Sequence, residues 1–376
     1  MDLNTLATPA AIIDVPRMQA NINRMQTHLN QLGVAFRPHV KTSKCLQVAK
    51  AQEAAGARGI TVSTLKEAEQ FFAAGFKDIT YAVGIAEAKL PQAADLMRRG
   101  CALKIITDSE ESARFIGAFS RTHKVNFSVL VEIDTDGHRS GVPPEAQELP
   151  DIAAALVSGG STLAGVLTHA GSSYDYSDQD VLINLAEQER AGCVRAAERL
   201  RAAGYECPIV SVGSTPTATR AQTLTGVNEV RAGVYVFFDL VMRNVGVCTL
   251  DDIALSVLAT VIGHQKEKGW AIVDAGWMAM SRDRGTARHG TDFGYGQVCT
   301  LEGTPLPGYT VSGANQEHGI ISLTGGLDSA IAERFPIGSR VRILPNHACA
   351  TGAQFPEYHA LVSPGNIEVW PRFYGW

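Results

Sequence analysis

Short apolar runs alternate with segments of helical composition through the first two thirds of the chain. Eight of these runs are rich in β-branched residues, and stretches rich in Ala, Leu, Glu, Gln and Arg separate them. The runs cover residues 34–40, 59–63, 78–83, 102–107, 127–133, 163–168, 208–212 and 229–233. Eight buried strands with intervening helices predict a closed parallel (β/α)8 barrel of the TIM-like α/β class over residues 15–245. An open doubly wound sheet is the main alternative, but its typical Gly-x-Gly-x-x-Gly turn is missing.

The pattern changes near residue 245, where helical spacing gives way to alternation of apolar and polar positions. Turn-forming Gly, Pro, Asp and Asn residues separate the alternating runs. These runs cover residues 255–262, 270–274, 309–312, 319–323, 340–344, 358–362 and 367–370. The sequence therefore predicts a second, antiparallel β domain over residues 246–376. The opening strand, residues 8–14, is expected to join that domain.

The longest helical segment is predicted from Gln179 to Ala203. Its apolar residues recur at the spacing of one helix face. They are Leu182, Leu185, Ala186, Cys193, Ala196 and Leu200. This spacing predicts a helix that buries one side against the barrel.

The composition and the net charge of the chain indicate which classes of partner are improbable. The chain has 376 residues, of which 45% are hydrophobic, and a net charge of −5 without a basic stripe. These values argue against nucleic acid and anionic membrane as partners. No apolar run is long enough to span a membrane, and the amino-terminal residues lead us to expect no secretory signal. The seven cysteines are scattered without a Cys-x-x-Cys pair, so we expect a cytoplasmic protein with reduced thiols.

Lys41 follows the first predicted barrel strand, and a helical pattern begins soon after it. The carboxyl ends of the strands form the active face of such barrels. An amine held there, partly out of water, loses its charge easily and can form a Schiff base with an aldehyde. The alternative is an ordinary surface lysine in a strand–helix turn.

Two glycine-containing segments follow the seventh and eighth strands. Small polar residues that open a helix offer hydroxyls, close backbone approach and partial positive charge to an anion. A plain N-cap is an equal interpretation of the first segment alone, but phosphate sites between strands seven and eight recur in these barrels. The candidate anion-binding residues are Gly213, Ser214, Thr215, Gly233, Val234 and Tyr235.

Two further strand ends carry polar side chains. Arg139, after the fifth strand, is a candidate to contact a cofactor oxygen or a substrate carboxylate through its planar fork. It could equally pair with Asp134 or Asp136 and only shape the loop. His169, after the sixth strand, could lie beside an aromatic cofactor or be a buried, hydrogen-bonded histidine.

His347 and Cys349 follow a strand in the predicted β domain. In extended chain, residues i and i+2 point to the same face, so this imidazole and thiolate could bind one metal ion. Two protein ligands leave coordination positions open, as a catalytic metal requires. The pair suits Zn²⁺, with Mn²⁺, Mg²⁺ or Co²⁺ as alternatives. A loop histidine beside a buried cysteine is the simpler interpretation.

Taken together, these segments resemble the fold-type III family of pyridoxal 5′-phosphate enzymes. Within it they are similar to the D-serine dehydratase and D-threonine aldolase branch, which shares its barrel with alanine racemase. The segments that carry the resemblance are residues 38–41, 168–174, 213–217, 231–235 and 345–349.

The resemblance implies a role for each matching residue. Lys41 would bind pyridoxal 5′-phosphate as a Schiff base and act as the base at the substrate Cα. Ser214, Thr215, Gly233 and Val234 would hold the phosphate, and His347 and Cys349 the divalent metal. The wider cofactor set also includes His169, Gly213 and Tyr235. The catalytic set adds His169, Tyr174 and Arg139 to Lys41.

The resemblance also implies the reaction. We expect elimination of water from a D-3-hydroxy amino acid, with D-threo-3-hydroxyaspartate first, giving oxaloacetate and ammonia. D-serine is the alternative substrate, and an aldolase that releases glycine and an aldehyde is the alternative reaction. The aldolases of this branch typically carry Asp where this chain has Cys349, which counts mildly against that reaction. A racemase and a non-catalytic cofactor-binding protein are the remaining rivals. Related enzymes are homodimers, so a homodimer is expected here.

Overall fold

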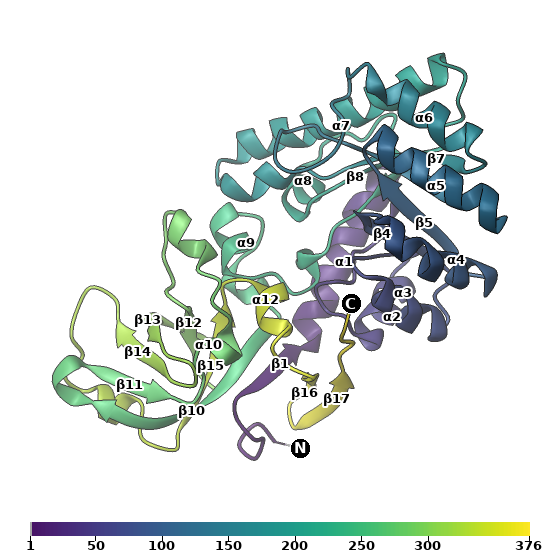
Figure 1. Ribbon diagram of the computed structural model, residues 1–376. Helices are drawn as coiled ribbons and strands as arrows, with labels where there is room; N and C mark the ends of the chain where they lie inside the picture. The colour runs from purple at the N-terminus through teal and green to yellow at the C-terminus, as the bar shows by residue number, and fades with distance from the viewer. Residues whose placement is uncertain (1) are drawn as a thin grey trace. The chain divides into compact units, whose positions relative to one another are not determined.

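The structure is a computed structural model that describes residues 2–376 in two compact units. The barrel unit consists of residues 24–233 and 373–376, and the sheet unit consists of residues 2–23 and 234–372. Helix α1 (Val15–Gln31) contributes to both. The elements of each unit are labelled in Figure 1.

The barrel unit contains an eight-stranded parallel sheet. Its strands are β2 (Ala35–Phe36), β3 (Ile60–Val62), β4 (Asp78–Gly84), β5 (Ala102–Thr107), β6 (Ser128–Ile133), β7 (Thr162–Thr168), β8 (Ile209–Val212) and β9 (Glu229–Val230). They pair in the order β2-β9-β8-β7-β6-β5-β4-β3. A parallel bridge between His39 and Thr61 joins the two ends of this order. The predicted parallel barrel is therefore confirmed.

Helices follow the strands of the barrel, as the alternating pattern predicts. They are α2 (Leu46–Ala54), α3 (Leu65–Ala73), α4 (Leu90–Arg98), α5 (Glu110–His123), α6 (Glu148–Ser158), α7 (Gln179–Ala202) and α8 (Thr215–Arg220). The predicted buried face of α7 is correct at Leu182, Ala186, Cys193, Ala196 and Leu200. Leu185 is only partly buried, and the same face also buries Glu189, a charged residue that the apolar pattern does not reveal.

The first barrel strand is shorter than predicted. The apolar run spans residues 34–40, but regular strand pairing covers only Ala35–Phe36. Pro38 has no N–H to donate to a neighbouring strand, so the ladder breaks there. The chain then pairs once more through the bridge at His39. This interruption lets the segment turn sharply at Lys41.

The sheet unit is built on nine strands, and the predicted antiparallel β domain is confirmed. They are β1 (Ala10–Asp14), β10 (Leu255–Gln265), β11 (Trp270–Val273), β12 (Gly296–Cys299), β13 (Pro305–Ala314), β14 (Gly319–Leu323), β15 (Arg340–Pro345), β16 (Glu357–Ser363) and β17 (Asn366–Pro371). Their order is β11-β14-β13-β12-β15-β10-β1-β16-β17. All pairs are antiparallel except β1 with β16. Four short helices accompany them: α9 (Leu240–Val245), α10 (Trp277–Met280), α11 (Ile331–Arg334) and α12 (Ala348–Gly352).

Strand β12 was not predicted from the sequence. Its centre is Gln297, a polar residue that interrupts the apolar alternation. The side-chain amide of Gln297 donates to the carbonyl oxygens of Val298, Leu306 and Tyr309 at 2.8–3.0 Å. A polar side chain that is satisfied by backbone carbonyls can be buried without a large penalty.

None of the helices in the described part of the chain combines the length and the apolar character needed to cross a membrane.

Candidate active site

Lys41 lies in the turn that joins β2 to α2, at the carboxyl-terminal end of the barrel strands. The Val40 N–H donates to Thr61 O at 2.9 Å, and the Lys44 N–H donates to Val40 O at 2.8 Å, which closes the turn. Lys44 has a φ of 45°, in the left-handed region that few non-glycine residues adopt. Lys41 itself is exposed. The predicted withdrawal of its amine from water is therefore not seen, because Lys41 lies beyond the last strand contact.

The turn that carries Lys41 packs against the segment after β9. The His39 N–H donates to Ala232 O at 2.8 Å. A Cβ atom on Gly233 would lie 3.1 Å from His39 O and 3.1 Å from Thr42 Oγ1. Glycine therefore allows the two segments to approach this closely, and the structure places the turn of Lys41 beside Gly233.

Positive charge surrounds two neutral histidines at this end of the barrel. Burial lowers the pKa of His39 well below its usual value, and the charges of Lys41 and Arg231 lower it further. Burial also lowers the pKa of His169 to about 3, with additional contributions from Lys41, Arg139 and Arg231. Both imidazoles are therefore neutral at neutral pH. Lys41, Arg139 and Arg231 thus offer positive charge to an anionic ligand at this end of the barrel.

The hydrogen bond of His169 determines which ring nitrogen carries its proton. His169 Nδ1 lies 2.9 Å from the carbonyl oxygen of Gly213. A carbonyl oxygen can only accept, so Nδ1 of the neutral ring must carry the hydrogen and Nε2 keeps its lone pair. The ring of Tyr174 lies with its centroid 6.1 Å from that of His169. The Tyr174 hydroxyl accepts from the Thr215 N–H at 3.5 Å.

Ser214 and Thr217 form a capping box at the start of α8. The Thr217 N–H donates to Ser214 Oγ at 3.2 Å, and the Ser214 N–H donates to Thr217 Oγ1 at 3.1 Å. The N-cap interpretation of this segment is therefore seen in the structure. Ser214 Oγ also lies 2.8 Å from Ser173 Oγ in the loop after β7. In that same loop, Ser172 Oγ is buried without a hydrogen-bond partner within the chain, which leaves a hydroxyl for a ligand.

Gly213 is required by the backbone around it. Its φ is 136°, and a Cβ atom there would overlap the backbone oxygen of Arg231. Its N–H donates to the carboxylate of Glu189 at 2.9 Å. The backbone N–H of Gly213 thus donates to Glu189, and its carbonyl oxygen accepts from His169.

Arg139 lies in the loop after β6 and is largely exposed. Its guanidinium is 3.7 Å from the carboxylate of Glu132, with 60% of its side chain exposed. The predicted alternative, a pair with Asp134 or Asp136, is wrong. Asp134 accepts from backbone N–H groups of its own loop, and Asp136 accepts from the Ser172 N–H at 2.8 Å. Both carboxylates accept hydrogen bonds from backbone N–H groups. Arg139 therefore has only its long contact to Glu132.

His347 and Cys349 lie together at the end of β15 in the sheet unit. His347 is the N-cap of α12, and Cys349 lies inside that helix. The expectation that extended chain brings the pair together is therefore wrong, because the chain becomes helical at Ala348. The two side chains nevertheless interact, and the negative charge of Cys349 raises the pKa of His347. No group of three or more potential metal ligands occurs within residues 2–376.

Two carboxylates that the sequence did not single out support the His347–Cys349 pair. Asp283 Oδ2 lies 2.7 Å from His347 Nδ1. Asp239 is buried and accepts from the Ala348 N–H at 2.9 Å. Burial opposes protonation of His347, but Cys349, Asp283 and Asp239 together raise its pKa to about 11. These three groups therefore favour positive charge on His347.

Val234 and Tyr235 form the buried start of the sheet unit, in a 3-10 turn over Val234–Val236. Tyr235 is fully buried. Two further arginines, Arg282 and Arg284, stack on the rings of Trp277 and Tyr295 at 4.7 and 5.0 Å. Arg284 also pairs with an aspartate, Asp292, at 2.9 Å.

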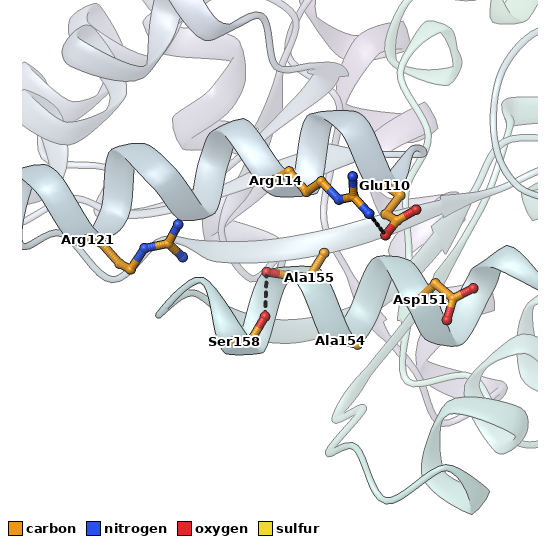
Figure 2. Close-up of a pocket in the computed structure, with 7 residues that line it drawn as sticks. All are labelled: Glu110, Arg114, Arg121, Asp151, Ala154, Ala155 and Ser158. Atoms are coloured by element: carbon orange, nitrogen blue, oxygen red, sulfur yellow. Dashed lines mark hydrogen bonds and ion pairs between the residues drawn. The ribbon is translucent and has the colours of Figure 1, made fainter.

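A surface pocket is present on the outer helices of the barrel unit. It lies between α5 and α6, where Arg114 pairs with Glu110 at 2.6 Å (Figure 2). Arg121 and Asp151 add one charge of each sign. The pocket contains none of the residues predicted for the active site.

A parallel α/β barrel joined to an antiparallel sheet is the fold of alanine racemase-like proteins. Residues 13–241 match the family model described as "Alanine racemase, N-terminal domain", and residues 254–361 match "Putative serine dehydratase domain". The chain belongs to the alanine racemase N-terminal domain family and combines that domain with a serine dehydratase domain.

Similar proteins extend over the whole chain. D-threo-3-hydroxyaspartate dehydratase from Delftia sp. (strain HT23) is 65% identical over 376 residues, which is 100% of this chain and 99% of the relative. D-serine dehydratase from Dictyostelium discoideum is 32% identical and covers 97% of this chain and 96% of its own length. A solved structure of a D-threo-3-hydroxyaspartate dehydratase mutant in the metal-free form superposes with a TM-score of 0.99, at 64% identity and 100% coverage of both chains.

Proposed function

We propose that this chain is a pyridoxal 5′-phosphate- and metal-dependent dehydratase that removes water from a D-3-hydroxy amino acid. D-threo-3-hydroxyaspartate is the proposed substrate, and oxaloacetate and ammonia are the products. The observation that carries the proposal is 65% identity to D-threo-3-hydroxyaspartate dehydratase over both complete chains. The reaction makes this protein a carbon–oxygen lyase.

The barrel end fits pyridoxal 5′-phosphate by charge and by donors. Lys41 supplies the primary amine, and the charges that lower the pKa values of His39 and His169 would favour a phosphate dianion. The buried Ser172 hydroxyl adds a donor without a partner in the chain. Ser214, Thr215, Gly233 and Val234 would hold the phosphate, and Lys41 the carbonyl carbon. When bound, the cofactor withdraws electron density from the substrate Cα.

Lys41 and His169 would handle protons near the reacting carbon. The amine of Lys41 would act as the general base that takes the Cα proton. His169 is neutral and presents an unprotonated Nε2, because its Nδ1–H is used by Gly213 O. It is therefore equipped to accept a hydrogen bond or a proton. The proposed catalytic set also includes Tyr174, whose hydroxyl contacts the Thr215 N–H.

His347 and Cys349 fit a divalent cation. Their imidazole and thiolate are suitable ligands for Zn²⁺, and the neighbouring carboxylates Asp239 and Asp283 favour positive charge at the site. A bound metal supplies Lewis acidity for the departing hydroxyl group. The cysteine at position 349 supports the dehydratase over the aldolase, because aldolases of this branch typically carry Asp there.

Arg139 is the proposed partner of the second carboxylate of 3-hydroxyaspartate. Arg282 and Arg284 already stack on aromatic rings, and Arg284 also pairs with an aspartate. Arg139 has only a long contact to Glu132 and lies close enough to His169 to lower its pKa. A planar guanidinium matches a carboxylate in a bidentate pair. D-serine, which lacks this carboxylate, is the second candidate substrate, supported by the Dictyostelium relative.

One assay separates the proposed reaction from its rivals. The holoenzyme is incubated with D-threo-3-hydroxyaspartate or D-serine, with and without EDTA, and keto acid, ammonia, glycine and the two enantiomers are measured. The proposal predicts oxaloacetate and equimolar ammonia from 3-hydroxyaspartate, lost with EDTA and restored by Zn²⁺. Release of glycine would indicate an aldolase, chelator-resistant racemisation a racemase, and no product a non-catalytic protein.

A further inference from the structure

Glu189 is a buried carboxylate that the proposed mechanism does not use. It lies on the inner face of α7, between the apolar positions Ala186 and Cys193. Only 2% of its surface is exposed. A glutamate so deeply buried is rare unless its oxygens are occupied by donors.

The donors to Glu189 come from two loops of the barrel. Glu189 Oε1 accepts from the Ala170 N–H at 2.9 Å and from the Gly213 N–H at 2.9 Å. The side chain of Thr217 also hydrogen-bonds to this carboxylate. One side chain thus ties the loop after β7, the loop after β8 and the start of α8 to a single point.

The two backbone groups that Glu189 holds lie directly next to site residues. Ala170 follows His169 in the chain, and Gly213 precedes Ser214. The carbonyl of Gly213 in turn accepts the Nδ1–H of His169 at 2.9 Å. The N–H of Gly213 donates to Glu189, and the carbonyl of Gly213 accepts from His169. The carboxylate of Glu189 is thereby connected to the orientation of the His169 ring.

We propose that Glu189 is a positioning residue that sets the orientation of His169 and the spacing of the two loops that receive the cofactor phosphate. The inference rests on the proposed function, since it assigns the loops to pyridoxal phosphate. Glu189 does not reach the ligand itself; it acts through Ala170 and Gly213. The conformation of these loops is thereby fixed before the cofactor binds, which reduces the ordering cost of binding.

The test compares three substitutions at Glu189 with a control on the same helix face. Glu189→Ala removes all three hydrogen bonds. Glu189→Gln keeps an oxygen for the two N–H groups, and Glu189→Asp keeps the charge but shortens the side chain. Cys193→Ala is the matched control, because Cys193 is also buried on α7 but its thiol donates to the carbonyl of Ser211 within β8, at 3.6 Å, and to neither loop.

Two measurements are made on each protein. The first is the dissociation constant for pyridoxal 5′-phosphate, from absorbance titration of the apoprotein. The second is nitrogen-15 NMR of histidine-labelled apoprotein, with the His169 signal assigned through His169→Gln. The NMR signal reports the Nδ1–H tautomer of His169 and needs no cofactor, so it tests Glu189 even if the proposed function fails. The melting temperature of each variant records loss of stability.

We expect Glu189→Ala and Glu189→Asp to raise the dissociation constant by about tenfold or more. The His169 tautomer should become mixed in both. Glu189→Gln should stay within about twofold of the parent, and Cys193→Ala should lower the melting temperature without changing affinity or tautomer. If Glu189→Ala does not fold, the affinity and the tautomer measured for Glu189→Asp test the inference. Unchanged affinity and tautomer in the Glu189 variants, or an equal change in Cys193→Ala, would overturn the inference.

Discussion

The carboxylate of Asp283 holds His347, the proposed metal ligand. Asp283 Oδ2 lies 2.7 Å from His347 Nδ1. When one ring nitrogen of a histidine is held by a carboxylate, the other is oriented toward the metal and becomes more basic. Asp283 lies far from His347 in the sequence, and nothing in its local pattern distinguishes it from other loop aspartates.

We predict that Asp283→Asn weakens metal binding by about 10- to 100-fold, because the amide holds the imidazole without negative charge. The affinity is measured by competition between the protein and a chromophoric chelator for Zn²⁺. Asp292→Asn is the control, since Asp292 pairs with Arg284 and not with His347. Equal affinities of the parent and Asp283→Asn would show that Asp283 does not support the metal.

The buried histidines of the barrel unit predict how stability changes with pH. The pKa of His169 is lowered to about 3 and that of His39 is lowered well below 6.5. Below pH 6.5 each of these two histidines therefore binds more protons in the unfolded chain than in the folded chain, so its contribution to stability rises with pH up to about 6.5. The urea midpoint should be lower at about pH 5.5 than at about pH 7.

His169→Gln removes one of these titrations, so it should reduce the change in urea midpoint between the two pH values. His123→Gln, at an exposed position on α5, should leave the change as it is. The same change in midpoint in the parent chain and in His169→Gln would contradict the neutral state assigned to His169.

At the scale of elements, the junction between β8 and α8 depends on Gly213. Its φ is 136°, and a Cβ atom there would overlap the backbone oxygen of Arg231. Gly204, after α7, provides a comparison, because its φ is 89° and no atom lies within 4 Å of the position that a Cβ atom would take. A side chain at position 213 would therefore suffer both backbone strain and a steric clash, whereas a side chain at position 204 would suffer backbone strain alone.

We predict that Gly204→Ala lowers the free energy of unfolding by about 1 kcal/mol and Gly213→Ala by about 3 kcal/mol or more. Urea denaturation of the two variants measures the difference. Cofactor affinity should fall only in Gly213→Ala, since Gly213 holds His169. Equal destabilisation by both substitutions would mean that the backbone near Arg231 moves aside easily.

The strand and helix pattern could be predicted from the sequence because each element carries its own periodicity. Each of the eight barrel strands overlaps a predicted β-branched run, but the first and the last are cut short, to Ala35–Phe36 and Glu229–Val230. Strand β12 escaped prediction because its polar centre, Gln297, breaks the apolar pattern, and its amide is satisfied by backbone carbonyls that the pattern does not reveal. The pattern of apolar and polar residues predicts which secondary structure a segment prefers, but it does not reveal the hydrogen bonds that a buried polar side chain forms with other segments.

The candidate site divides in the same way. Residues that follow strands, such as Lys41 and His169, could be predicted because the fold brings strand ends together. Glu189 and Asp283 could not, because each is defined by a partner in another segment. For Glu189, the only signal in the sequence is a charged residue at an apolar position of the α7 face.

At the scale of the whole molecule, we infer a homodimer from the resemblance to enzymes that complete each site with the partner's β domain. Sedimentation velocity in the presence of pyridoxal phosphate should give a mass of twice the 40.1 kDa of one chain. Dilution that produces monomers should reduce turnover in proportion. A monomer with full activity would contradict this inference.

The attachment of the cofactor to Lys41 is the central claim, and trapping by borohydride tests it most directly. The protein loaded with pyridoxal 5′-phosphate is reduced, digested and analysed by mass spectrometry, with Lys41→Ala treated in parallel. We predict the pyridoxyl modification on the peptide that contains Lys41, and its loss from Lys41→Ala. Modification of another lysine in its place, or no modification of an active enzyme, would contradict the role assigned to Lys41.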